Sequence, residues 1–405
     1  MKKSLIALAA LAAVSAASAQ SSVTLYGLVD IGYGAHNSTS RDGSVFTKSS
    51  GVMDGSNAGN RIGFRGTEDL GGGLKANFVV EQGISPTSAN VFSQRAAGPG
   101  HQQIGLPGGG FSTSTNRQSY LGLASASMGT LNIGFTYTNA YELSTLSGYM
   151  VGSEQIGGVT HLAGANLAVV GGTRANGLTY ISPNFSGFTV RAQYGANGAN
   201  LANFESNANG GQGLSSNKDT RFGLMLQYAN GPISAALAHT TMRSQAIAGG
   251  AANTALGATT NAFGVITAAP GAVQTGQSRS ASLTQLGGSY DFGVVKLAGT
   301  YHTGKDGGTA TSLLSSRVRG YQLGISAPFG AFVPFLMIGK ENVKTDTVAG
   351  DVRDLRQTQL GVRYNLSKRT TAYAMYGRET NNAVVAAAGA NYRQTKSIIG
   401  VAHSF

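Results

Sequence analysis

The ionisable side chains of this sequence form no catalytic grouping. Its six histidines have no metal-ligand spacing, and each is expected to be a loop or rim residue: His36, His101, His161, His239, His302 and His403. Gly71-Gly72-Gly73 lacks the Lys-Ser/Thr pair of a phosphate loop and predicts a turn. No Ser/His/Asp or paired-acid group recurs on adjacent segments, so neither an enzyme activity nor a cofactor is expected.

The basic residues show a clearer pattern. Arg61 and Arg65 alternate with Ile62 and Phe64, so an extended strand would place the two guanidiniums on the face opposite the apolar side chains. Arginine stays charged even beside other cations. The same alternation assigns five further cations to the polar face: Lys75, Arg191, Arg221, Lys296 and Arg363. A net positive polar face predicts a preference for anions.

These residues belong to segments with a period of two. Sixteen candidate strands are bounded by turn residues. Most have the roughly 9–11 residues of a tilted membrane strand. Their approximate spans are 22–34, 58–69, 73–83, 116–125, 129–138, 175–182, 187–196, 219–229, 232–242, 280–291, 293–304, 317–327, 331–342, 355–366, 369–380 and 394–405.

The connections between these segments alternate between short and long. Examples of the short connections are Leu70-Gly71-Gly72, Asn230-Gly231 and Leu366-Ser367-Lys368. The long connections have a dozen to nearly forty residues. Short periplasmic turns, long extracellular loops and an even strand count are typical of outer-membrane barrels. The sequence therefore predicts an all-β fold, a transmembrane antiparallel β-barrel of 16 strands. The segment 246–275, rich in Ala, Gly and Thr, is expected to be a flexible exposed loop.

Within the strands one face is apolar. Val23, Leu25, Val29 and Ile31 alternate with Thr24, Tyr26 and Asp30 in the first strand, and Leu74, Ala76, Phe78 and Val80 alternate with Lys75, Asn77, Val79 and Glu81 in the third. The last strand places Ile399, Val401, His403 and Phe405 on one face. Apolar side chains outside and polar ones inside predict a water-filled lumen.

Composition and the first residues agree with an exported protein. Lys2 and Lys3, an apolar stretch from Leu5 to Val14 and Ala17-Ser18-Ala19 predict a signal peptide at 1–19, followed by one barrel domain at 20–405. Cleavage removes two lysines, so the net charge falls from +12 to +10. Cysteine is absent and charged residues are only 11% of the chain. The basic residues form no stripe, so no nucleic-acid partner is expected.

Several motifs support a closer comparison over most of the mature chain. They include Val23-Thr24-Leu25-Tyr26-Gly27, Arg61-Ile62-Gly63-Phe64-Arg65-Gly66, Arg117-Gln118-Ser119-Tyr120-Leu121-Gly122-Leu123, Tyr180-Ile181-Ser182-Pro183 and His403-Ser404-Phe405. Jointly these motifs resemble those of the trimeric general-diffusion porins of Gram-negative bacteria. The resemblance implies a homotrimer in the outer membrane, with the third loop folded into the lumen.

The resemblance also implies a pore constriction. The third loop corresponds to about Asn139 to Thr173, and its carboxylates are Glu142 and Glu154. The arginines that the family places opposite this loop correspond by motif to Arg61, Arg117 and Arg174. Alternation does not place Arg117 in the lumen, because Arg117 shares its parity with Leu121 and Leu123; only the resemblance does.

The expected function is passive diffusion of small hydrophilic solutes and ions through an outer-membrane channel. Its expected partners are other copies of the chain, outer-membrane lipids and the permeating solutes. Two alternatives remain open at this point. One is a substrate-specific channel, although no cluster of inward aromatic residues is evident, and the other is a surface adhesin or structural barrel. A barrel enzyme is disfavoured by the lack of a catalytic group.

Overall fold

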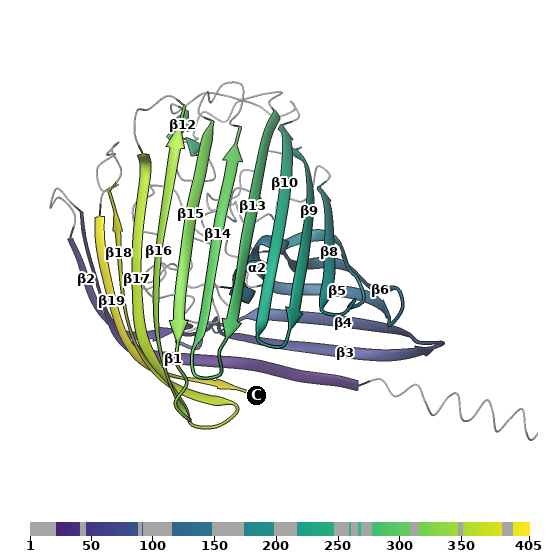
Figure 1. The fold of residues 1–405 in the computed structure, drawn as a ribbon, viewed down its shortest axis with the longest axis horizontal. Helices are drawn as coiled ribbons and strands as arrows, with labels where there is room; N and C mark the ends of the chain where they lie inside the picture. Colours follow the sequence, from purple (N-terminus) through teal and green to yellow (C-terminus); the bar gives the residue numbers. More distant parts are fainter. Residues whose placement is uncertain are drawn as a thin grey trace, which may run out of the picture.

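The chain forms a closed barrel of antiparallel strands, shown in Figure 1 as a computed structural model. The structure describes residues 22–40, 46–87, 91, 116–147, 174–197, 217–246, 259–260, 266–268, 278–307, 315–346, 351–382 and 392–405. The predicted signal peptide at 1–19 and Glu154 lie outside these residues.

Seventeen strands build the barrel wall. They are β1 (Ser22–Ser40), β2 (Phe46–Asp54), β3 (Arg61–Gly71), β4 (Leu74–Gly83), β5 (Asn116–Ser125), β6 (Gly129–Tyr137), β7 (Arg174–Ile181), β8 (Phe188–Asn197), β9 (Asn217–Asn230), β10 (Ile233–Ala246), β13 (Ser278–Asp291), β14 (Lys296–Asp306), β15 (Ser316–Ser326), β16 (Phe332–Thr345), β17 (Asp351–Asn365), β18 (Thr370–Asn381) and β19 (Tyr392–Ser404). Two further strands, β11 (Thr259–Thr260) and β12 (Ile266–Ala268), form a separate small sheet within the segment expected to be a loop.

Each wall strand pairs antiparallel with its neighbours, and the ring closes where β1 pairs with β19, from Leu28 opposite Ser404 to Ser40 opposite Tyr392. Both β2 and β3 pair with β1, at residues 31–39 and 22–28, so they share one position in the ring. Seventeen strands in the wall thus occupy 17 − 1 = 16 positions. This confirms the predicted class, a closed antiparallel barrel of 16 strands.

The prediction for the second strand needs a correction. A single strand was expected at 58–69, with a loop before it, but 46–54 is also strand and the two parts are separated by residues 55–60. These six residues lie opposite only two residues of β1, because Asp54 pairs with Ile31 and Arg61 pairs with Leu28. They therefore form an insert that leaves the ladder, as a large β-bulge does. A period-two pattern cannot show such an insert.

The two faces of the wall alternate as predicted. Ile399, Val401 and Phe405 are exposed on the outside, as are Val23, Leu25 and Val80, whereas Asp30 and Glu81 are buried on the inside. The inside is less uniformly polar than expected, because two areas of it are apolar. One lies on β14, β16, β18 and β19 and contains Phe335, Met337, Met375 and Ile398. The other lies beneath a helix.

That helix, α2 (Asn139–Ser147), follows β6 directly and contacts β8, β9, β10, β13 and β14. Thr138 begins it, because the Thr138 hydroxyl accepts a hydrogen bond from the Tyr141 amide at 3.3 Å. Leu143 is fully buried against Met225, Ala236 and Ala238. These wall residues face inward, so α2 lies against the inner side of the barrel. The small alanines provide the space that the helix occupies.

The wall is not equally high all round. Strands β4–β8 have 8–10 residues, whereas β14–β18 have 11–15. About 9–11 residues suffice for a tilted strand to cross the hydrocarbon core. The longer strands of Figure 1 therefore extend past it. Among the described residues, no helix has the length and apolar character to cross a membrane.

A polar contact reinforces the seam where the ring closes. Asp30 on β1 is fully buried, and its carboxylate accepts a hydrogen bond from the Tyr373 hydroxyl of β18 at 2.6 Å. Tyr373 reaches β1 by passing over β19 at Gly400, where a Cβ atom would lie 2.3 Å from the tyrosine oxygen. Glycine is required at position 400 because of this close approach, and the contact ties three strands together.

Substitution Gly400→Ala should therefore destabilise the barrel. The new methyl group must displace Tyr373 and leave the buried Asp30 short of one hydrogen bond, which costs about 2 kcal/mol. The matched control is Gly299→Ala, where the nearest atom is a methyl group of the flexible, lipid-facing Leu323. Thermal unfolding followed by gel mobility in cold detergent should give a lower midpoint for Gly400→Ala than for the control. Equal midpoints would contradict the role of this close approach.

Candidate functional site

Two of the arginines expected at the pore meet at a single carboxylate on the inner wall. Glu81 of β4 is largely buried, and its side chain forms an ion pair with Arg117 of β5 at 2.6 Å. Arg61 of β3 lies 3.8 Å away from the other oxygen, to which the Tyr26 hydroxyl donates a hydrogen bond at 3.1 Å. Three neighbouring strands and β1 thus contribute to one cluster of charges.

The position of Arg117 is explained by a β-bulge. In the ladder between β4 and β5, Glu81 lies opposite Gln118, but Gln82 lies opposite Asn116, so Arg117 is an extra residue on its strand. Consecutive residues of a bulge break the strict alternation of faces. Arg117 therefore points inward although Leu121 and Leu123 point outward. The bulge thus explains why Arg117 faces the lumen, as the family resemblance implies, although its parity in the sequence suggested the outward face.

Tyr137, at the end of β6, connects the third expected arginine to this cluster. Its hydroxyl accepts a hydrogen bond from Arg117 at 2.9 Å, and the guanidinium carbon of Arg174 lies 5.0 Å from the centre of its ring. The ring also stacks on Tyr141 of α2 at 4.6 Å. The structure therefore brings Arg61, Arg117 and Arg174 together.

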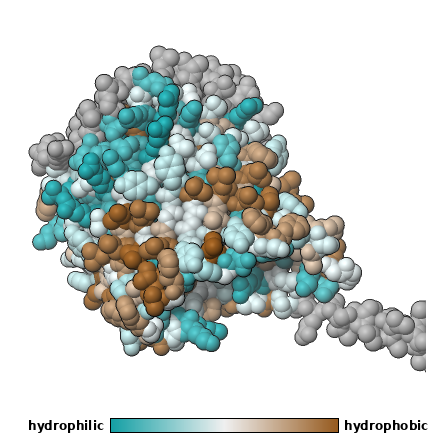
Figure 2. Space-filling view, in the orientation of Figure 1, coloured by the Kyte–Doolittle hydropathy of each residue, from teal (hydrophilic) through white to brown (hydrophobic). Residues whose placement is uncertain are grey.

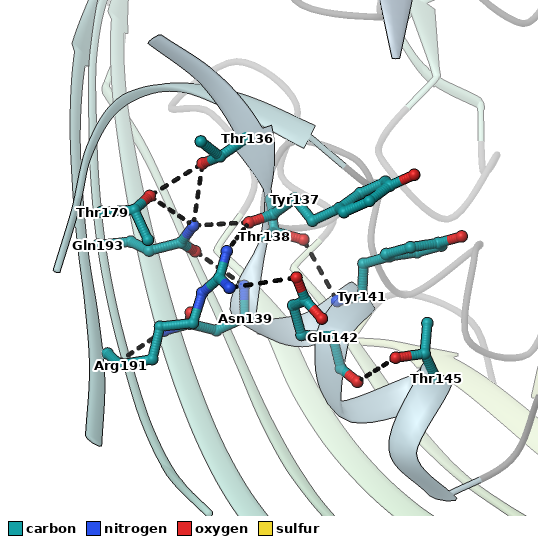
Figure 3. A network of polar contacts seen from close by, with 10 residues as sticks. All are labelled: Thr136, Tyr137, Thr138, Asn139, Tyr141, Glu142, Thr145, Thr179, Arg191 and Gln193. Carbon is teal, nitrogen blue, oxygen red and sulfur yellow. Dashed lines mark hydrogen bonds and ion pairs between the residues drawn. The ribbon is translucent and has the colours of Figure 1, made fainter. Parts of the chain in front are cut away.

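Glu142 does not face these three arginines directly. Its carboxylate pairs with Arg191 of β8 at 3.1 Å, and Arg191 also donates to the Tyr137 carbonyl oxygen at 2.7 Å. Figure 3 shows both contacts. Gln193, the next inward residue of β8, accepts a hydrogen bond from the Asn139 amide at 2.8 Å and donates to the same carbonyl. Arg191, expected only to line the pore, thus holds the first turn of α2 against the wall.

The other expected pore-lining residues also occupy inward positions but lie apart from this cluster, except Arg65. The Arg65 guanidinium carbon is 5.2 Å from the centre of the Tyr26 ring. Lys75 and Lys296 lie near the short connections. Arg221 is buried on β9, and the guanidinium carbon of Arg363 is 5.1 Å from the Phe335 ring centre.

The cluster has a positive excess. Its five arginines are Arg61, Arg65, Arg117, Arg174 and Arg191, and its acids are Glu81 and Glu142. The formal balance is 5 − 2 = +3. Sequence reasoning did not select Glu81, Tyr26 or Tyr137 as site residues. The alternation of β4 gave Glu81 an inward position, and this was the signal that could have identified it.

The insert at 55–60 also contacts Arg61, in addition to Glu81. The amides of Asn57 and Ala58 donate to the Asp30 carboxylate at 2.5 and 2.8 Å, and the Asn60 side chain accepts from the Asp30 amide at 2.5 Å. Within the insert, the Gly59 carbonyl oxygen accepts a hydrogen bond from Arg61 at 3.1 Å. Asp30 thus fixes the loop that orients the Arg61 guanidinium.

No three His, Cys, Asp or Glu side chains meet in a metal-binding group among the described residues. What the structure shows instead is a closed β-barrel, apolar outside, with an excess of fixed positive charge on its inner wall. In such a ring each strand pairs with a neighbour on both sides, so no sheet edge is left open to the hydrocarbon core. These features define a membrane channel of the outer-membrane barrel class.

Comparison with known proteins gives the family. A model of the Gram-negative porin family matches residues 7–384, and the chain therefore belongs to this family. Outer membrane porin protein 32 of Delftia acidovorans is 30% identical over 431 aligned residues, which cover 100% of both chains. The protein is an outer-membrane porin, a channel and not an enzyme.

Solved structures agree with this fold. The anion-selective porin from Comamonas acidovorans matches with a TM-score of 0.65 and 25% identity, covering 95% of this chain and 100% of that chain. OmpT of Vibrio cholerae, solved in a trimer form, matches with a TM-score of 0.61, covering 95% and 99% of the two chains. Because OmpT is only 14% identical, its likeness concerns the fold alone.

The Asp30 contacts predict a difference between two neutral substitutions. Asp30→Asn removes the charge but keeps an oxygen that can accept from the insert amides, whereas Asp30→Ala removes both. We expect Asp30→Ala to give a lower anion-to-cation permeability ratio than Asp30→Asn, because the released insert no longer orients Arg61. Reversal potentials of single channels in a salt gradient measure this ratio.

The same comparison in an Arg61→Gln background is the control. There the two Asp30 variants should have equal permeability ratios, because the guanidinium that the insert orients is gone. A difference that persists in this background would show that Asp30 acts on the pore by another route.

Proposed function

We propose that this porin is an anion-preferring diffusion channel. Its narrow zone is formed by Arg61, Arg117 and Arg174 on one side and by the third connection, the loop between β6 and β7, on the other. The observation that carries the proposal is the meeting of these three arginines. Arg61 and Arg117 contact one carboxylate, Glu81, and Arg174 lies over the ring of Tyr137, whose hydroxyl binds Arg117. The relative from Comamonas acidovorans is described as anion-selective, which supports the same preference here.

The magnitude of the fixed charge is sufficient for such a preference. In water, a unit charge about 4 Å away changes the energy of a passing ion by about 1 kcal/mol, a factor of about five in local concentration. The excess of +3 in the cluster therefore favours anions over cations by several such factors, less screening by salt. Arginine suits this position because it cannot lose its proton.

The third connection, 138–173, is proposed to narrow the lumen. Its first part, α2, already lies against the inner wall through Leu143 and through the ion pair of Glu142 with Arg191. Glu154, the other acid of this connection, is proposed to complete the acidic side. Its position lies outside the described residues.

The proposed orientation places the short connections in the periplasm and the long ones outside the cell, as in bacterial barrels of this type. Residues 1–19 are proposed to be a cleaved signal peptide. We further propose a homotrimer that contacts its copies through β4–β6. The outward residues of these short strands carry no charge and include Phe78, Val80, Leu121 and Ile133. OmpT of Vibrio cholerae has been solved as a trimer.

The triple substitution Arg61→Ala, Arg117→Ala, Arg174→Ala should lower the anion-to-cation permeability ratio by about fivefold or more, because it removes three charges from the narrow zone. Planar-bilayer recordings should show conductance in steps of three for a trimer. A control that removes the same charge from the outside of the wall, Arg319→Ala, Arg356→Ala, Arg378→Ala, should leave the ratio unchanged. If the two triple variants behaved alike, the selectivity would arise elsewhere.

Substitution Glu81→Gln should have the opposite effect. It removes the carboxylate among the arginines with almost no change in shape, so the permeability ratio for anions should rise. Glu379→Gln is the matched control, because Glu379 is equally buried on the inner wall but lies on β18, bonded to Gln357 and Tyr392. A fall in the ratio for Glu81→Gln would mean that Glu81 acts mainly by ordering the arginines.

A further inference from the structure

Tyr137, the last residue of β6, lies between the arginine cluster and the helix α2. The guanidinium carbon of Arg174 is 5.0 Å from the centre of its ring, and the ring of Tyr141 on α2 stacks on it with a centroid distance of 4.6 Å. Its hydroxyl accepts a hydrogen bond from Arg117 at 2.9 Å and donates one to the Glu81 carboxylate at 3.4 Å. One side chain thus contacts two arginines of the proposed narrow zone, a carboxylate and the helix.

The backbone of Tyr137 is held in place as well. Its carbonyl oxygen accepts hydrogen bonds from Arg191 and from Gln193, each at 2.7 Å. Figure 3 shows these two bonds and the Tyr137 ring beside the Tyr141 ring. Because α2 begins only two residues later, at Asn139, a displacement of the helix must either move Tyr137 or break its contacts.

The contact that fixes α2 to the wall lies on other strands than the arginines. Leu143 is fully buried against Met225 of β9 and against Ala236 and Ala238 of β10. We call this contact the docking of α2. The arginines of the proposed narrow zone lie on β3, β5 and β7. Docking of the helix and arrangement of the arginines therefore depend on different parts of the wall, and the stacked rings of Tyr137 and Tyr141 connect them.

We propose that Tyr137 is a positioning residue that couples the docking of α2 to the arrangement of Arg117 and Arg174, and thereby to the anion preference of the pore. This inference rests on the proposed function of these arginines. While α2 is docked, the Tyr137 ring and hydroxyl hold both guanidiniums in place.

When α2 leaves the wall, the arginines keep their charge but lose this support. Guanidinium donors have a fixed planar geometry, so their orientation matters as well as their charge. An arginine that moves from about 4 to about 8 Å from the path of an ion loses half of its interaction energy in water, a factor of about two in local anion concentration. The coupling therefore changes selectivity without removing a charge.

A cysteine reporter measures docking, because the chain contains no cysteine of its own. Leu143→Cys places a thiol where Leu143 is fully buried. Lipid-facing side chains such as Leu226 and Leu237 cover the outside of β9 and β10, and Figure 2 shows apolar residues over the middle and lower part of the outer face. A small uncharged maleimide therefore reaches the thiol from the lumen when α2 leaves the wall, and the labelling rate measures undocking.

In this reporter background, Tyr137→Leu should raise the labelling rate about fivefold, the factor that corresponds to one stacked aromatic pair. Tyr137→Phe keeps the ring and should label at the rate of the parent. Tyr26→Leu is the matched control. Tyr26 also bonds to Glu81 and contacts Arg65, but it lies on β1, whereas α2 packs against β8, β9, β10, β13 and β14. Equal labelling rates for Tyr137→Leu and Tyr26→Leu would overturn the proposal.

The converse experiment displaces the helix and measures the pore. Leu143→Asn places a polar group in the apolar pocket without a change in charge, and the anion-to-cation permeability ratio should fall about twofold or more. In a Tyr137→Leu background, where the ratio is already lowered, Leu143→Asn should change it little. Met337→Asn should leave the ratio at the wild-type value, because Met337 is equally buried but belongs to the other apolar area of the inner wall. A fall by the same factor in both backgrounds would refute the coupling through Tyr137.

The two measurements separate this inference from the proposed function. Labelling requires no ion flow, so Tyr137→Leu protein that is folded in detergent, as judged by gel mobility before heating, reports on docking alone. The parent labelling rate in this variant would refute the coupling and keep the anion-preferring channel. Absence of anion preference in the wild type would refute the proposed function, while the labelling rates would still decide whether Tyr137 holds α2.

Discussion

The closure of the ring is the constraint on which the rest of the structure depends. In lipid, an unpaired backbone amide or carbonyl group costs several kcal/mol, so a sheet can cross a membrane only when its two edges pair. Here the edges are β1 and β19, which pair from Leu28 to Ser40. The Asp30 and Tyr373 contact lies at this seam, and the same carboxylate holds the insert beside Arg61. Closure and pore geometry thus share one residue.

The closed ring also decides where charge can be placed. Because side chains alternate between lumen and lipid, each strand can carry cations inward while remaining apolar outward. In β3–β8 the arginines occupy such inward positions. A cluster of like charges remains stable there because Glu81 lies among them and Tyr137 binds two of them. Ions in the water-filled lumen screen the remaining excess.

The sequence was sufficient to predict most of the strands and the direction of their side chains, because both follow from a period of two. The closed barrel followed from the alternation of short and long connections. The sequence was insufficient where the chain leaves that period. The bulge at Arg117 and the insert at 55–60 each add residues to one strand, and only the pairing with the neighbouring strand shows how many. The pairing of Glu142 with Arg191 depends on the direction in which α2 leaves β6, which no local pattern encodes.

The unequal lengths of the wall strands determine where cations can lie on the inner and on the outer face. An inward cation is in water at any level of the lumen, so the short strands β5, β7 and β8 can carry Arg117, Arg174 and Arg191. An outward cation is tolerated only beyond the hydrocarbon, because burying it in lipid costs about 2–4 kcal/mol at the midplane. Only strands that extend past the hydrocarbon core can carry one, as β15–β18 do with Arg319, Arg356 and Arg378. Strand length at the long connections therefore limits where the outside of the wall can carry charge.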